Sequence, residues 1–169
     1  IAAHVSKTDV ALWLRIADMA LTLENRRHAI YCLSRAEKGS DGILDDGERN
    51  LLRLNCADLF EEFGEKKKAI MQYEQIIETL GSKDVMIDPY EVHIKCMDLC
   101  MECNLKPLAA KLFGGYARKN AARVDMNAML FLINLVSELD WWEKVVEYVE
   151  LSRRVWEEKG HPSYEAMKT

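Results

Sequence analysis

The sequence predicts an all-α fold, a right-handed superhelix (α-solenoid) built from about four antiparallel helix pairs. Only three prolines and eight glycines interrupt the 169 residues, and the alternation of β-branched residues that is typical of strands is scarce. Small and bulky apolar residues recur at helical spacing, and the pattern returns after forty residues: 69 minus 29 and 109 minus 69 for Ala29, Ala69 and Ala109. Such internal repetition is typical of stacked helical repeats.

The first helix pair is expected around Trp13–Ala36. Ser6–Asp9 supplies capping oxygens, so a helix is expected from near Thr8 to near Leu23. After a turn at Glu24-Asn25, a second helix should continue to about Lys38 and end at the glycines of Gly39–Gly42.

Three further pairs follow at similar spacing. The second starts near Asp45 and turns at Gly64, and the third starts at Asp88-Pro89 and turns at Asn104-Leu105. Known helix-pair repeats have a period of about 34 residues, so we expect an insertion of about six residues at Ile43–Arg49. A divergent fourth pair covers Asp125–Glu138 and Trp141–Glu158. Its apolar faces should hold Met129, Leu132, Ile133, Val136, Val145 and Val149.

We therefore expect one array with repeats at 10–43, 50–83, 90–123 and a divergent 126–159. Gly81–Asp84 should break the chain between the second and third pairs, and Gly160–Pro162 should end the last helix. The first residue is Ile1 rather than methionine, so the array is expected to be a piece of a longer protein.

Charge and cysteine content narrow the class of function. Lys and Arg number 23 against 28 Asp and Glu, a formal charge of -5, so direct binding of nucleic acid is not expected and a basic partner is favoured. Five cysteines, with no apolar run long enough for a signal peptide or a membrane span, indicate reduced thiols in the cytosol or nucleus. No membrane association is expected.

Two clusters have both a structural and a functional interpretation. His93, Cys96, Cys100 and Cys103 have metal-like spacing, but they follow one helical face and lack a second ligand pair, so core packing is favoured over a zinc or redox site. Trp141-Trp142 with Trp156 could anchor a partner; for the adjacent pair we favour one indole in the core and the other partly exposed, because neighbours on a helix point about 100° apart.

No catalytic motif is found in the sequence. It contains no glycine-rich phosphate loop, nucleophile elbow or paired histidine ligands, so we expect no enzyme, no cofactor and no metal. A zinc-dependent enzyme is the remote alternative. The basic clusters Arg26-Arg27, Lys66–Lys68 and Arg153-Arg154 are interpreted as solvated faces; a nucleic-acid-binding helical repeat, the alternative from another class, would use them.

The pairs at Trp13–Ala36 and Ala57–Ile76 resemble tetratricopeptide (TPR) repeats, in which small residues let two helices approach closely. In TPR arrays the first helix of each pair lines a concave groove. The resemblance implies a scaffold that binds other proteins. TPR domains that clamp the acidic C-termini of chaperones use Lys and Asn side chains in this groove, whereas aspartates stand there in this chain, so that activity is disfavoured.

The first helices share a pattern of an apolar residue followed, one turn later, by an acidic or amide residue. Residues four apart lie on the same helix face. Stacked, these positions predict an apolar row beside an acidic row, suited to a basic, partly apolar partner segment. The predicted groove residues are Leu14 with Asp18, Leu54 with Asp58, Ile94 with Asp98, and Leu130 with Asn134.

A narrower resemblance covers roughly residues 1–79. It rests on Ala2–His4, Asp9, Leu12-Trp13, Arg15, Ala17, Asn25, Ala29–Cys32, Ser34–Ala36, Leu59–Gly64 and Ala69–Tyr73. These residues resemble the TPR-rich subunits of transcription factor IIIC. The resemblance implies a nuclear scaffold that contacts other transcription factor IIIC subunits and helps assemble the RNA polymerase III machinery by recruiting TFIIIB. A TPR adaptor of another multiprotein complex is the alternative.

Overall fold

The computed structural model describes residues 7–80 and 86–158, which fold into eight α-helices and one short 3-10 helix, with no strand in those two ranges. None of the helices in these ranges is long and apolar enough to cross a bilayer. The all-α prediction is confirmed. The predicted cap at Ser6, break at Gly81–Asp84 and stop at Gly160–Pro162 lie outside the described residues, as does Ala2–His4.

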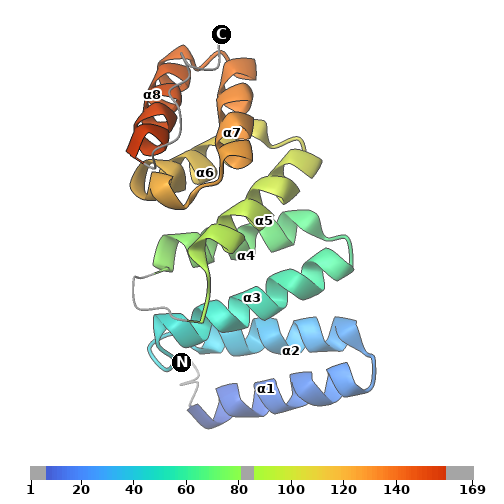
Figure 1. Ribbon diagram of the computed structural model, residues 1–169. Helices are drawn as coiled ribbons and strands as arrows, with labels where there is room; N and C mark the ends of the chain where they lie inside the picture. The colour runs from blue at the N-terminus through green and yellow to red at the C-terminus, as the bar shows by residue number, and fades with distance from the viewer. Residues whose placement is uncertain (1–6, 81–85, 159–169) are drawn as a thin grey trace. The chain divides into compact units, whose positions relative to one another are not determined.

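The chain divides into two compact units, of which the first covers residues 1–92. It holds α1 (Lys7–Thr22), α2 (Arg26–Gly39), α3 (Asp46–Glu62) and α4 (Lys66–Thr79). Each helix packs on the next in chain order, so that α1 with α2 and α3 with α4 form two antiparallel pairs (Figure 1).

The second unit covers residues 93–169. Its helices are α5 (Pro89–Glu102, whose first turn belongs to the first unit), α6 (Lys106–Asn120), the 3-10 helix η1 (Ala121–Arg123), α7 (Met126–Glu138) and α8 (Trp142–Glu158). Within this unit α7 packs on both α6 and α8 (Figure 1). The repeat boundaries and the single continuous array remain predictions.

One turn geometry closes all four helix pairs. Its central residue has left-handed backbone, with φ of 56° at Glu24, 71° at Gly64, 57° at Asn104 and 57° at Asp140. The next amide then bonds back to the carbonyl five residues earlier, at 2.8, 2.8, 2.7 and 2.9 Å respectively. This is the Schellman ending of a helix, which satisfies carbonyls that the helix leaves free. Only the second of the four turns has the glycine that favours this backbone.

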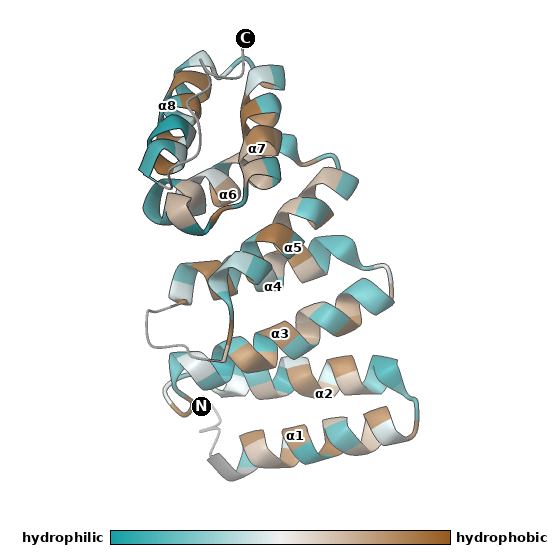
Figure 2. Cartoon of the chain, viewed as in Figure 1, coloured by the Kyte–Doolittle hydropathy of each residue, from teal (hydrophilic) through white to brown (hydrophobic). Residues whose placement is uncertain are grey.

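Small residues occupy the contacts between paired helices. Ala17 and Ala29 are fully buried in the first pair, and Ala57 and Ala69 are fully buried in the second. A methyl group at these positions allows the helix backbones to approach closely, as the repeat pattern predicted. In Figure 2 the apolar residues lie in patches along the helices and extend over much of α7.

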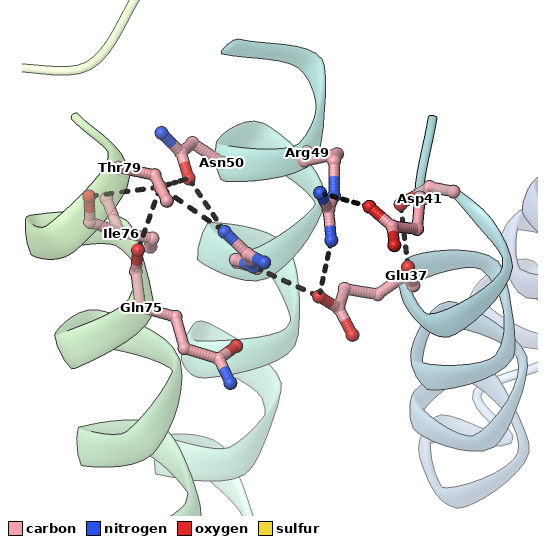
Figure 3. Close-up of polar contacts among 9 residues, drawn as sticks. Glu37, Asp41, Arg49, Asn50, Gln75, Ile76 and Thr79 are labelled. Carbon is pink, nitrogen blue, oxygen red and sulfur yellow. Dashed lines mark hydrogen bonds and ion pairs between the residues drawn. The ribbon is translucent and has the colours of Figure 1, made fainter. Parts of the chain in front are cut away.

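A polar network joins α2, α3 and α4. It is centred on Arg53 of α3, which takes the repeat position that Trp13, His93 and Met129 take in the other first helices. Arg53 is only 6% exposed; its Nε donates to Glu37 Oε1 at 3.1 Å, and its Nη1 donates to Asn50 Oδ1 and Thr79 Oγ1 at 3.3 Å each. Thr79 Oγ1 also donates to Asn50 Oδ1 at 2.8 Å (Figure 3). A buried charge requires such partners.

The buried face of α8 differs from the prediction. Trp141 and Trp142 are 38% and 61% exposed, so neither indole is in the core, and Val149 is 49% exposed. The buried residues are Tyr148, Ser152 and Val155, at helical steps of four and three. This register turns Trp142 and Val149 outward. The predictions of a core indole and of a buried Val149 are therefore wrong.

Candidate functional site

The predicted groove residues of the first unit lie at the surface of α1 and α3. Leu14 and Leu54 are half-buried, and Asp18, one turn after Leu14, is exposed. Asp58 is half-buried because it faces α4, from which the Tyr73 hydroxyl donates to Asp58 Oδ1 at 3.3 Å and to Glu61 Oε1 at 2.5 Å. Asp18 is thus open to a partner, whereas Asp58 also belongs to the contact between α3 and α4.

The Tyr73 phenol keeps its proton over the accessible pH range. Burial raises the pKa of Tyr73 well above its usual value, and the hydrogen bond to Glu61 and the charges of Glu61 and Asp58 raise this pKa further. A protonated phenol donates a hydrogen bond but adds no charge. The negative charge around Asp58 and Glu61 is therefore left uncompensated by Tyr73.

The second unit holds the other two predicted pairs. On α5, Ile94 is half-buried and Asp98 exposed. Although Asp98 is exposed, desolvation by the protein around its carboxyl raises its pKa, and the charge of the neighbouring Glu102 raises this pKa further. On α7, Leu130 is 45% exposed and Asn134 is exposed. Each pair thus has an accessible polar member one turn from an apolar one.

The eight predicted groove residues fall equally into the two units, with two pairs in each. The structure brings the members of each pair onto one helix face. Alignment of the pairs into continuous rows remains a prediction.

The cysteine cluster is part of the core. Cys96 and Cys100 are completely buried, His93 is buried, and its ring centroid lies 4.5 Å from that of Tyr116. Core packing, the favoured interpretation, is confirmed for these residues; Cys103 is half-buried. In the described part of the chain, no group of three His, Cys, Asp or Glu side chains is placed to hold a metal ion.

A cleft that the sequence did not predict lies in the second unit, between α6 and α8. It has a volume of about 400 Å³ and is lined by Leu108 and Lys111 of α6, Trp141, and Tyr148 of α8, among others. Tyr148 reaches it because Gly114 has no side chain: a Cβ placed there would lie 2.2 Å from the Tyr148 hydroxyl. The sequence signal for this arrangement was the helical spacing of Tyr148, Ser152 and Val155, which form the buried face of α8.

Comparison with known proteins places the chain by fold. No protein-family model matches it. The chain is similar to the solved structure of MamA, a TPR-like solenoid, with a TM-score of 0.55 and 13% identity over 89% of this chain and 74% of that one. The fold is of the TPR type. A double mutant of MamA is also similar, with a TM-score of 0.49 and 12% identity over 89% of this chain and 76% of that one.

One curated relative is similar in sequence to this TPR-type chain. It is the human protein named general transcription factor 3C polypeptide 3, with 32% identity over 85 residues. The match covers 50% of this chain and 9% of the relative, so the chain spans only a small part of that protein's length.

Proposed function

We propose that this TPR-type chain is a protein-interaction scaffold whose first helices bind a basic, partly apolar segment of a partner. The observation that carries the proposal is the pairing of an apolar residue with a polar one a turn later on each first helix. Asp18 and Asp98 are exposed, while Leu14 and Ile94 beside them are half-buried. An apolar anchor next to a Lys or Arg meets complementary chemistry at each pair.

We further propose that the chain belongs to an assembly of the transcription factor IIIC type in the nucleus. The support is its similarity over 85 residues to human general transcription factor 3C polypeptide 3, together with the resemblance of residues 1–79. On this proposal its partners are other transcription factor IIIC subunits and components of TFIIIB. The alternative is a TPR adaptor of another multiprotein complex, which would use the same helix surfaces to bind different partners.

The proposed role is binding rather than catalysis. The large pKa shifts have structural causes: Arg153 and Arg154 hold the pKa of Glu150 at about 2 on the surface of α8, and burial, aided by Glu37, raises the pKa of the Cys56 thiol to about 12. Cys56 is buried in the core, and Glu150 lies on α8, which carries none of the proposed binding positions. The raised pKa of Tyr73 keeps it a protonated hydrogen-bond donor to Asp58 and Glu61. Strongly shifted groups that gather around a cleft would favour an enzyme.

The test uses charge reversal in each unit separately. Asp18→Lys and Asp98→Lys place a cation where a basic segment should bind, and Glu78→Lys on α4 makes the same charge change at an exposed position outside the predicted groove. At position 58 the test uses Asp58→Asn instead of a charge reversal, because the amide oxygen still accepts the hydrogen bond from the Tyr73 hydroxyl. Circular dichroism checks that every variant is folded.

Binding is measured with two probes: purified TFIIIB components and a fluorescein-labelled peptide in which leucines alternate with pairs of lysines. We expect each reversal to weaken binding about tenfold through repulsion, with Glu78→Lys unchanged. If the peptide binds and no TFIIIB component does, the transcription assignment is contradicted and the scaffold proposal stands. If Asp18→Lys and Asp98→Lys leave the binding of both probes unchanged, the proposed groove is contradicted.

A further inference from the structure

The cleft between α6 and α8 has a charge opposite to that of the chain. Three cationic side chains, Lys111, Arg118 and Lys144, line it. In the described residues one carboxylate, Glu147, pairs with two of them: its Oε1 lies 3.4 Å from Arg118 Nε and its Oε2 lies 2.6 Å from Lys144 Nζ. Three positive charges against one negative charge leave this cleft basic in a chain of formal charge -5.

The cleft also has an apolar floor and wall. Pro107, Leu108 and Ala110 of α6 line one side, and Trp141 lines the other. Its volume of about 400 Å³ is at the small end of the range for ligand pockets, which runs from about 300 to 1,000 Å³. Such a space takes one bulky side chain, not a cofactor or a long ligand.

The local structure holds this cleft in place. Tyr148 is buried directly over Gly114, and the Arg118 guanidinium donates to the Gly114 carbonyl at 3.4 Å. Arg118 and Lys144 are also fixed from α8 by Glu147, so Lys111 is the exposed cation that is left to meet a ligand. A carboxylate can pair with Lys111 without first breaking an ion pair.

We propose that this cleft binds an acidic peptide segment of a partner protein, with one bulky apolar side chain inserted beside Trp141 and a neighbouring carboxylate on Lys111. The charge and the apolar floor together select this occupant, since carboxylates flanking an anchor match the cations at the rim. A nucleic acid is less well matched, because its phosphates need several unpaired cations and Arg118 and Lys144 are already paired. The site differs in helices and in charge from the acidic groove proposed above, and it does not depend on that proposal.

The chain offers matched control variants for each component. Lys119 lies on the same helix as Lys111 and is also exposed but does not line the cleft, so Lys111→Glu is compared with Lys119→Glu. Trp142 is exposed next to Trp141 and does not line the cleft, so Trp141→Ala is compared with Trp142→Ala. Each comparison holds the chemical change constant and varies only the position.

The experiment is a nitrogen-15 NMR titration of the full chain with a short peptide that carries one phenylalanine between two pairs of glutamates. We expect saturable shifts at the Lys111 amide and the Trp141 indole N–H, and about tenfold weaker binding in Lys111→Glu and Trp141→Ala. Lys119→Glu and Trp142→Ala should bind as the unmodified chain does. The same peptide with glycine in place of phenylalanine should bind at least about tenfold more weakly.

Three results overturn the proposal. The first is no saturable shift with the phenylalanine peptide. The second is equal weakening by Lys111→Glu and Lys119→Glu, which indicates diffuse charge attraction. The third is tighter binding of a single-stranded oligonucleotide that Lys111→Glu abolishes, which assigns the cleft to nucleic acid.

Discussion

Replacing Arg53 by methionine tests whether the polar network that joins α2, α3 and α4 stabilises the first unit. The change removes the donor to Glu37 Oε1 at 3.1 Å and the weaker contacts to Asn50 and Thr79 at 3.3 Å. Asn50 and Thr79 keep their mutual hydrogen bond of 2.8 Å. The main loss is therefore the charged bond to Glu37.

The size of the loss follows from how Glu37 is placed. Its side chain is 15% exposed, and after the change its nearest cation is Arg49, whose Nη2 lies 4.0 Å away. A hydrogen bond to a charged group is worth about 1.5–3 kcal/mol, and methionine restores apolar contact in the space of the arginine stem. We expect Arg53→Met to lower the free energy of unfolding by about 2–3 kcal/mol.

A double-mutant cycle with Glu37→Gln isolates the pair. We expect a coupling energy of about 1–2 kcal/mol, read from the hydrogen exchange of α3 and α4 amides, which reports on the first unit alone. Arg49→Met is the comparison: its closer partner, Asp41 at 3.2 Å, is exposed, and its Nη2 lies only at 4.0 Å from Glu37 Oε1, so the loss should stay below about 1 kcal/mol. A coupling energy below about 0.3 kcal/mol would refute the reasoning.

Three further predictions concern the left-handed turns, the Cys56 thiol and the contact at Gly114. Glu24→Gly should stabilise the first unit by about 0.5–1 kcal/mol and Gly64→Ala should destabilise it by about 1 kcal/mol, because left-handed backbone is costly with a side chain. A Cβ added at Gly64 meets no atom within 4 Å, so the loss there comes from the backbone. Urea denaturation measures both changes. Burial, and to a smaller extent the charge of Glu37, raises the pKa of Cys56 from 9.0 to about 12, so the folded protein keeps a proton that the unfolded chain loses above pH 9. The stability this gives is full below pH 9 and falls by up to about 1.4 kcal/mol per pH unit as the pH rises to 12; Cys56→Ala should show a correspondingly smaller fall in urea titrations across this range. Gly114→Ala should cost about 1–3 kcal/mol through overpacking, whereas Gly115→Ala, with open space around its Cβ, should cost nothing measurable in thermal unfolding.

The helices were predicted well because their ends depend on local residues. Asn25 accepts from the His28 amide, Asp45 forms a capping box with Glu48, and Asp125 accepts from the Ala128 amide. Each of these contacts spans three residues along the chain, so the sequence alone contains them.

The register of α8 was not predictable in the same way. One indole of Trp141-Trp142 was expected in the core because neighbours on a helix point about 100° apart, but the buried face of α8 depends on Gly114 in α6, over which Tyr148 fits. That contact joins residues 34 positions apart, as 148 minus 114 gives. The cleft beside it was missed for the same reason, since it exists only when α6 and α8 are placed together.

The candidate groove is intermediate between these cases. Helical periodicity identified Leu14, Asp18 and Asp98 as surface positions, and the structure places them there in their own units. The hydrogen bond from Tyr73 to Asp58 could not be predicted, because it depends on the packing of α4 against α3. Asp58→Lys would therefore disturb the contact between α3 and α4 as well as the binding of a partner.

The repeated left-handed turn determines where the chain tolerates added residues. At Glu24-Asn25 the backbone closes α1, and the Asn25 side chain caps α2 three residues on, so an insertion there breaks both ends at once. Gly42 lies in the connection from α2 to α3, is exposed, and a Cβ added there would meet no atom within 4 Å. A protease site or a fluorescent label inserted after Gly42 should leave both helix pairs intact, which makes this connection the place to engineer the protein.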